Sequence, residues 1–276
     1  MLHAFALRMT VLLAVLAVSS PALAQVNAES LRPNPLRAGW SGGVEGSFAL
    51  SRGNIELLDI GGGGRVQYQT LHPLPPSQEG VSAPLPYIAQ RVFLTGSARF
   101  AERAQSAFIN QAFVHARWTG MWHERVGTDV FAQYQFNEFL RMQGRAVAGT
   151  GVRVEIVHAP GFMMWGGSGY MFEYNRISVL PGAADAPETF EHRWTNYLTM
   201  RLALLANRLL LQNTLYYQPR FDDFTDFRVL EEFEALSKVT ELFGLGATLS
   251  VLHDSAPPTG VKETDLRLMS TLRLSF

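Results

Sequence analysis

The chain ends in the stretch DLRLMSTLRLSF (residues 265–276), and this stretch decides the fold. Large apolar residues alternate with polar ones along it, which is the period of a β-strand with one apolar and one polar face. A soluble edge strand rarely leaves such an apolar face uncovered. The pattern is typical of the closing strand of a transmembrane β-barrel, where apolar residues meet lipid and polar residues point into the lumen. The apolar face comprises Leu266, Leu268, Leu272, Leu274 and Phe276.

Residues 1–24 have the pattern of a signal peptide. A basic start that includes Arg8 precedes an apolar core at 11–18, and Ala22-Leu23-Ala24 has the small-x-small form of a cleavage site. The core is too short for a membrane-spanning helix, and no later window approaches ~20 consecutive apolar residues. We therefore expect an exported chain that crosses a membrane with strands. Residues 25–38 contain two prolines and no period, and we expect them to form a periplasmic leader.

The composition agrees with a sheet that faces lipid. Hydrophobic residues make up 47% of the chain and charged residues only 17%, a balance that suits a lipid-facing sheet because the apolar residues alternate with polar ones. The formal charge of −1 gives no basic excess for nucleic acid. The chain has no cysteine, which excludes both a disulfide-stapled domain and a thiolate metal site.

The alternating pattern recurs at hairpin spacing along residues 39–276. It predicts an all-β fold, an antiparallel transmembrane β-barrel of about 12 strands, with 10 and 14 as alternatives. A soluble periplasmic β-sandwich is the remaining structural alternative. A proline-rich insert at 71–86 interrupts the pattern, and we assign it no role. The predicted strands cover residues 40–50, 58–68, 88–101, 107–118, 129–140, 145–157, 163–175, 193–206, 208–218, 227–239, 241–252 and 264–276.

Several stretches resemble one known family, the salt-induced outer-membrane proteins, which are grouped as a domain of unknown function. They are GWSGGVEGSF (39–48) leading to SRGN (51–54), FAQYQFNEF (131–139), YYQPR (216–220) with DDF (222–224), and PPTGVK (257–262). The resemblance implies a barrel in the outer membrane of a Gram-negative envelope and a link to salt or osmotic stress. It carries over no catalytic residue. This chain departs from the family by the 71–86 insert.

The inward faces of the predicted strands carry the candidate functional residues. Arginines set against a few carboxylates could line a conducting, anion-favouring, porin-like passage. Alternatively the charges pair with one another and leave a plugged or narrow lumen, which we favour because small barrels have room for little more than side chains. The predicted lumen-lining residues are Glu45, Asp59, Arg65, Arg91, Arg99, Arg117, Arg153, Glu155, Glu173, Arg193, Arg201, Glu232, Glu234, Arg267 and Arg273.

We predict that the protein is not an enzyme, with no catalytic, cofactor or metal site. The alternative is a lipid-modifying barrel enzyme, since His253 and Ser255 have the His-x-Ser spacing seen in the outer-membrane phospholipase, where histidine activates a lipid-facing serine. The surrounding sequence does not otherwise resemble that family, and turn formation explains the two residues better. Asp222, Asp223 and Asp226 could bind a cation but are more often simply solvated. The glycines at 61–64 lack the lysine of a phosphate loop and suit a strand bend.

The expected partners are those of a barrel in the outer membrane. We expect contacts with lipid and lipopolysaccharide, a monomer, and no nucleic acid. Leu272, Leu274 and Phe276 resemble the signal that barrel proteins present to their assembly machinery. Tryptophan and tyrosine near strand ends are predicted to form interfacial girdles. The candidates are Trp40, Trp118, Trp165, Trp194, Tyr68, Tyr134, Tyr170, Tyr174 and Tyr217.

Overall fold

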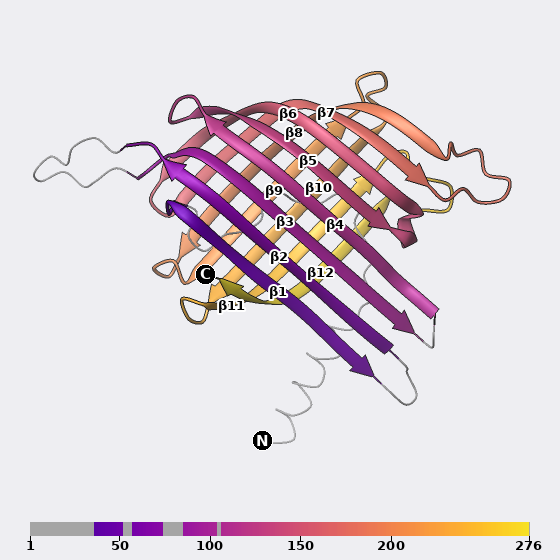
Figure 1. The fold of residues 1–276 in the computed structure, drawn as a ribbon, viewed down its shortest axis with the longest axis horizontal. Coiled ribbons are helices and arrows are strands. Elements are labelled where there is room, and N and C mark those ends of the chain that lie inside the picture. Colours follow the sequence, from indigo (N-terminus) through magenta and orange to yellow (C-terminus); the bar gives the residue numbers. More distant parts are fainter. Residues whose placement is uncertain (1–35, 52–56, 74–84, 104–105, 276) are drawn as a thin grey trace, which may run out of the picture.

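The computed structural model describes residues 36–51, 57–73, 85–103 and 106–275. Within these ranges the chain forms twelve antiparallel strands and one short 3-10 helix, η2 (Glu138–Leu140) (Figure 1). None of the helical segments described has the length and apolar character needed to cross a membrane. The strands are β1 (Gly39–Ser51), β2 (Leu57–Leu71), β3 (Ile88–Arg103), β4 (Ser106–Met121), β5 (Val126–Asn137), β6 (Met142–Ala159), β7 (Phe162–Ile177), β8 (Glu188–Leu204), β9 (Leu209–Pro219), β10 (Phe227–Lys238), β11 (Phe243–Asp254) and β12 (Thr264–Ser275).

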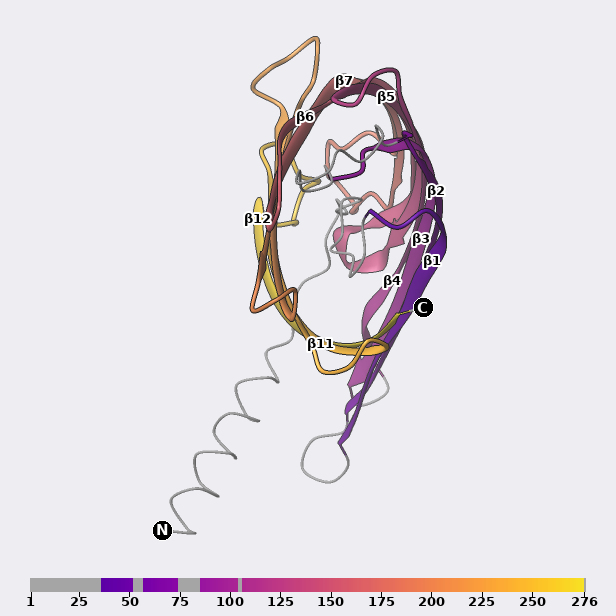
Figure 2. The same cartoon turned by 90° about the vertical axis from the view of Figure 1, so that its left-hand side faces the viewer.

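The twelve strands close into one barrel. Each strand pairs with its neighbours in the sequence, and β12 pairs with β1, with Leu272 opposite Gly46 and Ser275 opposite Gly43. This closure satisfies the edges that an open sheet would leave bare. Figure 2 looks along the barrel and shows a flattened ring. The predicted all-β barrel and its strand count are confirmed.

Side chains alternate between the two faces as predicted. On β12, Leu266 is 62% exposed and Leu272 is 54% exposed, whereas Arg273, the next residue on the same strand, is buried. Leu204, which a soluble sandwich would pack inside, is 39% exposed. The apolar residues therefore surround the barrel on its outside, and the soluble sandwich is excluded.

The two ends of the barrel differ in their connections. β1 begins and β12 finishes at the same end of the barrel. This end also carries the short turns 122–125, 160–161, 205–208 and 239–242. The opposite end, here called the loop end, carries the longer connections 178–187, 220–226 and 255–263. Outer-membrane barrels have short periplasmic turns and longer extracellular loops. Apart from the long connection 72–87, which joins β2 to β3 at the end with the short turns, this pattern places the loop end outside. The signal peptide, Phe276 and most of both the leader and the 71–86 insert lie outside the described residues.

Two local predictions are wrong. A strand was expected to run to Leu140, but β5 ends at Asn137, whose side chain accepts hydrogen bonds from the backbone of Phe139 (3.1 Å) and Leu140 (3.3 Å). This capping competes with the strand ladder and starts η2 instead. Trp165, expected in a girdle, is buried inside the barrel. It lies an odd number of residues from the outward Tyr170, so the two cannot share a face.

The outward face of β7 to β10 carries a polar stripe among apolar residues. Ser168 donates to Asn196 (2.8 Å), and Asn213 donates to Glu231 (3.1 Å). Glu231 is exposed on β10, where Phe233 on the same face is also exposed. A carboxylate on the lipid-facing side of a barrel is destabilising, by less than the 2–4 kcal/mol found for a basic residue.

We expect Glu231→Gln to raise the free energy of unfolding in lipid vesicles by about 1 kcal/mol, because it removes a charge from lipid and keeps the contact with Asn213. Denaturant titration measures the change. Glu188→Gln is the matched control, since Glu188 is exposed at the loop end of β8 and should give no gain. A loss of stability in Glu231→Gln would contradict a lipid-facing position for this carboxylate.

Candidate functional site

The predicted lumen-lining residues all lie at inward-facing positions, where each is buried or half-buried. The structure distributes them over distinct parts of the lumen. Glu173 and Arg193 belong to a cluster toward the loop end, and Arg117, Arg153 and Glu155 lie on the wall formed by β4 to β8. Buried Arg91 and Arg201 lie nearer the opposite end. The remaining residues, Glu45, Asp59, Arg65, Arg99, Glu232, Glu234, Arg267 and Arg273, lie on β1 to β3 and β10 to β12.

The densest group of charges is the Glu173 cluster, defined as Glu173, Arg145, Arg193 and Arg228. Glu173 has no exposed surface. Its carboxylate accepts two hydrogen bonds from Arg228 (2.6 and 2.8 Å) and one from Arg145, and Arg193 Nε lies 3.7 Å away. β10 is three strands from β7 in the ring, so the Arg228 contact crosses the lumen. The cluster therefore ties separate parts of the wall together.

Further carboxylates balance the arginines of the Glu173 cluster. Arg193 pairs with Glu191 (2.6 Å) and Asp226 (2.9 Å), and Arg228 pairs with Asp254 (2.8 Å). Arg220 at the loop end shares Asp226 at 3.1 Å. With Asp222, which pairs with Arg220 at 2.6 Å, four arginines thus meet five carboxylates. Paired charges of this kind are stable in a low-dielectric interior only when each one has a partner, and removal of one partner typically costs roughly 3–5 kcal/mol.

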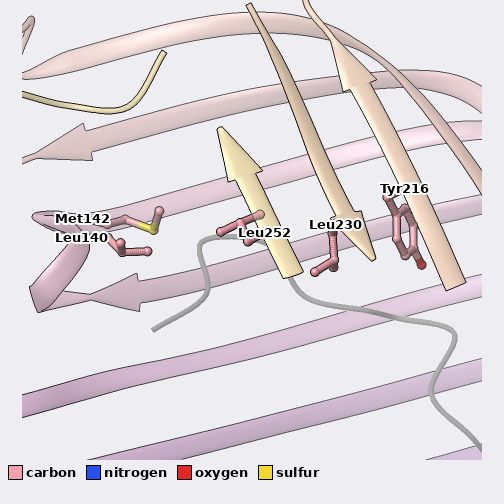
Figure 3. Packing of buried hydrophobic residues seen from close by; sticks show 5 residues of the cluster. All are labelled: Leu140, Met142, Tyr216, Leu230 and Leu252. Atoms are coloured by element: carbon pink, nitrogen blue, oxygen red, sulfur yellow. The ribbon is translucent and has the colours of Figure 1, made fainter. Parts of the chain in front are cut away.

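An apolar layer lies beside these charges, since three of its residues line the same cavity as Arg228. Figure 3 shows its five side chains. It consists of Leu140 and Met142, where β6 begins, packed against Tyr216, Leu230 and Leu252 from β9, β10 and β11. In the twelve-strand ring β6 lies three to five strands from β9, β10 and β11, so the layer joins strands that are not neighbours. Leu230 has no exposed surface. The apolar layer and the Glu173 cluster together form what we call the seal.

Three connections at the loop end are joined above the seal. Arg141 Nε donates to the carbonyl of Ser178 (2.7 Å), and Arg141 also contacts Asp185 and the carbonyl of Thr259. Asp185 accepts hydrogen bonds from the backbone N–H (3.1 Å) and the hydroxyl (3.0 Å) of Thr259. These contacts link the connections 138–141, 178–187 and 255–263 into a lid.

The wall formed by β4 to β8 is filled by aromatic rings. The Arg117 guanidinium lies between the rings of Phe131 (5.6 Å) and Tyr197 (5.5 Å), an arrangement that stabilises the cation. The Tyr197 hydroxyl donates to Asp129 (2.7 Å), which lies 3.8 Å from Arg117. A Cβ atom on Gly167 would lie 2.3 Å from the Tyr197 ring, so only glycine fits there. The space left on this side is about 40 Å³.

The opposite wall keeps a larger space. A cavity of about 200 Å³ lies between β1 to β5 and β10 to β12, where Gly43, Gly61 and Gly63 face inward. The predicted strand-bend glycines therefore leave room for side chains of the neighbouring strands, since a Cβ atom on Gly61 would lie 2.6 Å from Oγ of Ser47, its paired residue on β1. The cavity is flanked by Arg65, Arg99, Arg267 and Arg273 and by Asp59, Glu45, Glu232 and Glu234.

The charges around this cavity balance, with four arginines and four carboxylates. Arg99 pairs with Asp59 (2.6 Å), and Arg273 lies 3.3 Å from Glu45 and 3.8 Å from Glu234. An anion-favouring passage requires an excess of positive potential along its wall. The described residues around this cavity provide no such excess.

The residues considered for catalysis and for cation binding have structural partners. His253 Nδ1 contacts Thr264 Oγ1 (2.9 Å), while Ser255 Oγ donates to the carbonyl of Thr225 (2.8 Å) and accepts from the backbone of Phe227 (2.8 Å). Asp222, Asp223 and Asp226 bond to Arg220, to Thr225 and to the arginines named above, respectively. In the part of the chain that the structure describes, no group of three His, Cys, Asp or Glu side chains could hold a metal.

Sequence reasoning missed several residues of the seal and the lid. Arg145 and Arg228 lie at inward positions near strand ends, and strict alternation could have found them. Arg141, Asp185 and Thr259 carry no local signal. Arg141 and Thr259 are 118 residues apart, and only the folded loops bring them together.

The lid should depend on the ionised form of Asp185. The Thr259 backbone N–H holds the pKa of this carboxyl below its ordinary value, and the Thr259 hydroxyl and Arg141 add to the effect. Because the pKa is lowered, this contribution is present at neutral pH and is lost as the pH falls below the ordinary aspartate range near 3.9.

We expect Asp185→Asn to raise the hydrogen-exchange rate of the Thr259 amide at neutral pH by at least about tenfold, since an amide accepts a weaker hydrogen bond than a carboxylate. NMR exchange measurements test this. Asp222→Asn is the control, because Asp222 belongs to the 220–226 loop and bonds to Arg220 rather than to the lid. Equal exchange rates in wild type and Asp185→Asn would contradict the lid contact.

Comparison with known proteins gives one family and several solved barrels. No curated protein matches the chain. Among solved structures it is similar to the KdgM porin (TM-score 0.40, 9% identity, 86% of this chain and 99% of that one). It is also similar to the NanC porin (0.41, 8%, 85% and 97%) and to the translocator domain of the autotransporter NalP from Neisseria meningitidis (0.44, 11%, 99% and 95%). With TM-scores this low, no solute or activity is inferred from them.

The family model that matches is described as "Protein of unknown function, DUF481", and it matches residues 89–276. The match covers more than half of the chain, including the seal, the lid and β12. It agrees with the closed sheet whose apolar residues face outward. The chain therefore belongs to the DUF481 family, the salt-induced outer-membrane proteins, and is a β-barrel of the bacterial outer membrane.

Proposed function

We propose that the protein is a structural barrel of the outer membrane whose lumen is closed by the seal, so that it passes no solutes in this state. The observation that carries the proposal is the fully buried Glu173 carboxylate, which binds Arg145, Arg193 and Arg228 from three other strands. The apolar layer beside it reaches across the same part of the lumen. Together they occupy the path that a solute would need.

The link to salt or osmotic stress is part of this proposal and comes from the family. The physical character of the seal supports it. Salt weakens exposed ion pairs, whereas buried pairs are screened much less. A seal built on the buried Glu173 cluster would therefore stay closed at high external salt, when a leaking barrel would harm the cell.

The other candidate functions receive less support. The charges around the main cavity balance, and its volume of about 200 Å³ holds roughly seven waters. His253 and Ser255 bond to other residues, so we propose no catalytic activity and no cofactor. We propose that the exposed apolar belt contacts lipid and that the aromatic residues at the loop end contact lipopolysaccharide, with the protein acting as a monomer.

Single-channel recording in planar bilayers tests the seal. We expect the refolded wild type to stay closed in 1 M KCl. Glu173→Gln removes the charge that holds three arginines together, and their mutual repulsion should produce discrete openings with anion preference. Asymmetric salt and the reversal potential give the sign of that preference.

Glu231→Gln is the matched control for this experiment, because it is the same chemical change on the lipid-facing side and should leave the barrel closed. Stable openings of the wild type would contradict the proposal. If these openings preferred anions and neutralising Arg117 or Arg201 weakened that preference, a narrow anion channel would replace the closed barrel as the proposed function.

A further inference from the structure

A buried carboxylate to which the described part of the chain gives no partner lies at the outer mouth of the barrel. Asp265, the second residue of β12, is 7% exposed. Among the described residues, its side chain makes no hydrogen bond and no ion pair within 4.0 Å. Burial of a polar group costs free energy unless a hydrogen bond compensates, and for a charge the cost is larger. Within the described ranges the carboxylate therefore has neither a cationic nor a hydrogen-bonding partner.

Asp265 borders a cavity of about 180 Å³ beneath the lid. The cavity lies between the loops 178–187 and 255–263, and it is separate from the lumen cavity described above. A volume of this size would hold about six water molecules. The apolar part of its lining consists of Leu140, Met142, Ile177, Leu252, Pro257, Pro258 and Val261.

The charges that line this vestibule favour a cation. Asp185, Glu191 and Asp254 are already bonded to Thr259 and to arginines. Asp265 and the exposed Glu263 remain, with the exposed Lys262 as the basic residue nearby. Lys262 acts on Asp265 only at a distance, since they form no ion pair. The lining residue Arg228 is bonded to Glu173 and Asp254, so two carboxylates face one lysine, and of these two carboxylates only Asp265 is buried.

The shape of the site selects among cations. A divalent metal would need several converging oxygens, and the described residues hold no group of three acidic or histidine side chains suited to one. An ammonium group can donate up to three hydrogen bonds and needs no such cage. Leu140, Met142 and Leu252 offer an apolar floor for a short aliphatic body. We propose that the vestibule binds a small organic cation, a short aliphatic amine whose ammonium group contacts Asp265.

Calorimetric titration of the refolded full-length barrel with 1,4-diaminobutane tests the proposal. We expect saturable binding to the wild type and at least a tenfold weaker affinity in Asp265→Asn. 1,4-Butanediol, which has the same length but no charge, should not bind. Glu188→Gln is the matched control, since it removes a carboxylate at the same end of the barrel but outside the vestibule.

Two outcomes of the titration would overturn the proposal. The first is no binding to the wild type, and the second is an equal loss of affinity in Asp265→Asn and Glu188→Gln, which would indicate general surface attraction. Denaturant titration of ligand-free Asp265→Asn checks that this variant is folded. Because the carboxylate has no partner in the described part of the chain, ligand-free Asp265→Asn should be at least as stable as the wild type toward denaturant, and a clear loss of stability would mean that Asp265 has a structural partner. None of these outcomes depends on whether the lumen conducts.

Discussion

A barrel in lipid must turn its apolar side chains outward and its charges inward, and in a narrow lumen those charges must neutralise one another. The Glu173 cluster is where this constraint is most severe. Glu173 on β7 has no exposed surface, and its carboxylate binds Arg145, Arg193 and Arg228. These arginines come from β6, β8 and β10. Each arginine that reaches across the lumen fills space that water would otherwise occupy. Charge balance and the filling of this part of the lumen are thus the same arrangement of side chains.

The two sides of the flattened lumen satisfy this constraint in different ways. On β4 to β8, glycines make room for the Phe131 and Tyr197 rings, which enclose the Arg117 guanidinium. On β1 to β3 the inward glycines are not covered by rings, and a cavity remains. Inward glycines therefore have opposite effects on the two sides of the lumen. On β4 to β8 they make room for aromatic rings, whereas on β1 to β3 they leave a cavity. The open side depends on ion pairs such as Arg99 with Asp59 to keep its charges compensated.

The alternation of residues was enough to predict the barrel, its twelve strands and the inward position of the lumen residues, because a period of two is a local property of each strand. Prediction failed where a local rule met a competing interaction. The Asn137 side chain ended β5 early by capping η2. Contacts across the lumen, such as Arg228 with Glu173, depend on the ring of strands as a whole. The lid joins residues from three loops that are far apart in the sequence, and no local spacing predicts these contacts.

The outer mouth and the seal share side chains, which couples them physically. Leu140, Met142 and Leu252 form part of the apolar layer and also the floor of the vestibule. Arg228 lines the vestibule and binds Glu173, and its other partner, Asp254, lines the vestibule as well. A group that enters the vestibule therefore meets residues of the seal. Any occupant that packs on this floor or competes for Asp254 acts directly on the seal, with no need for a longer path through the barrel.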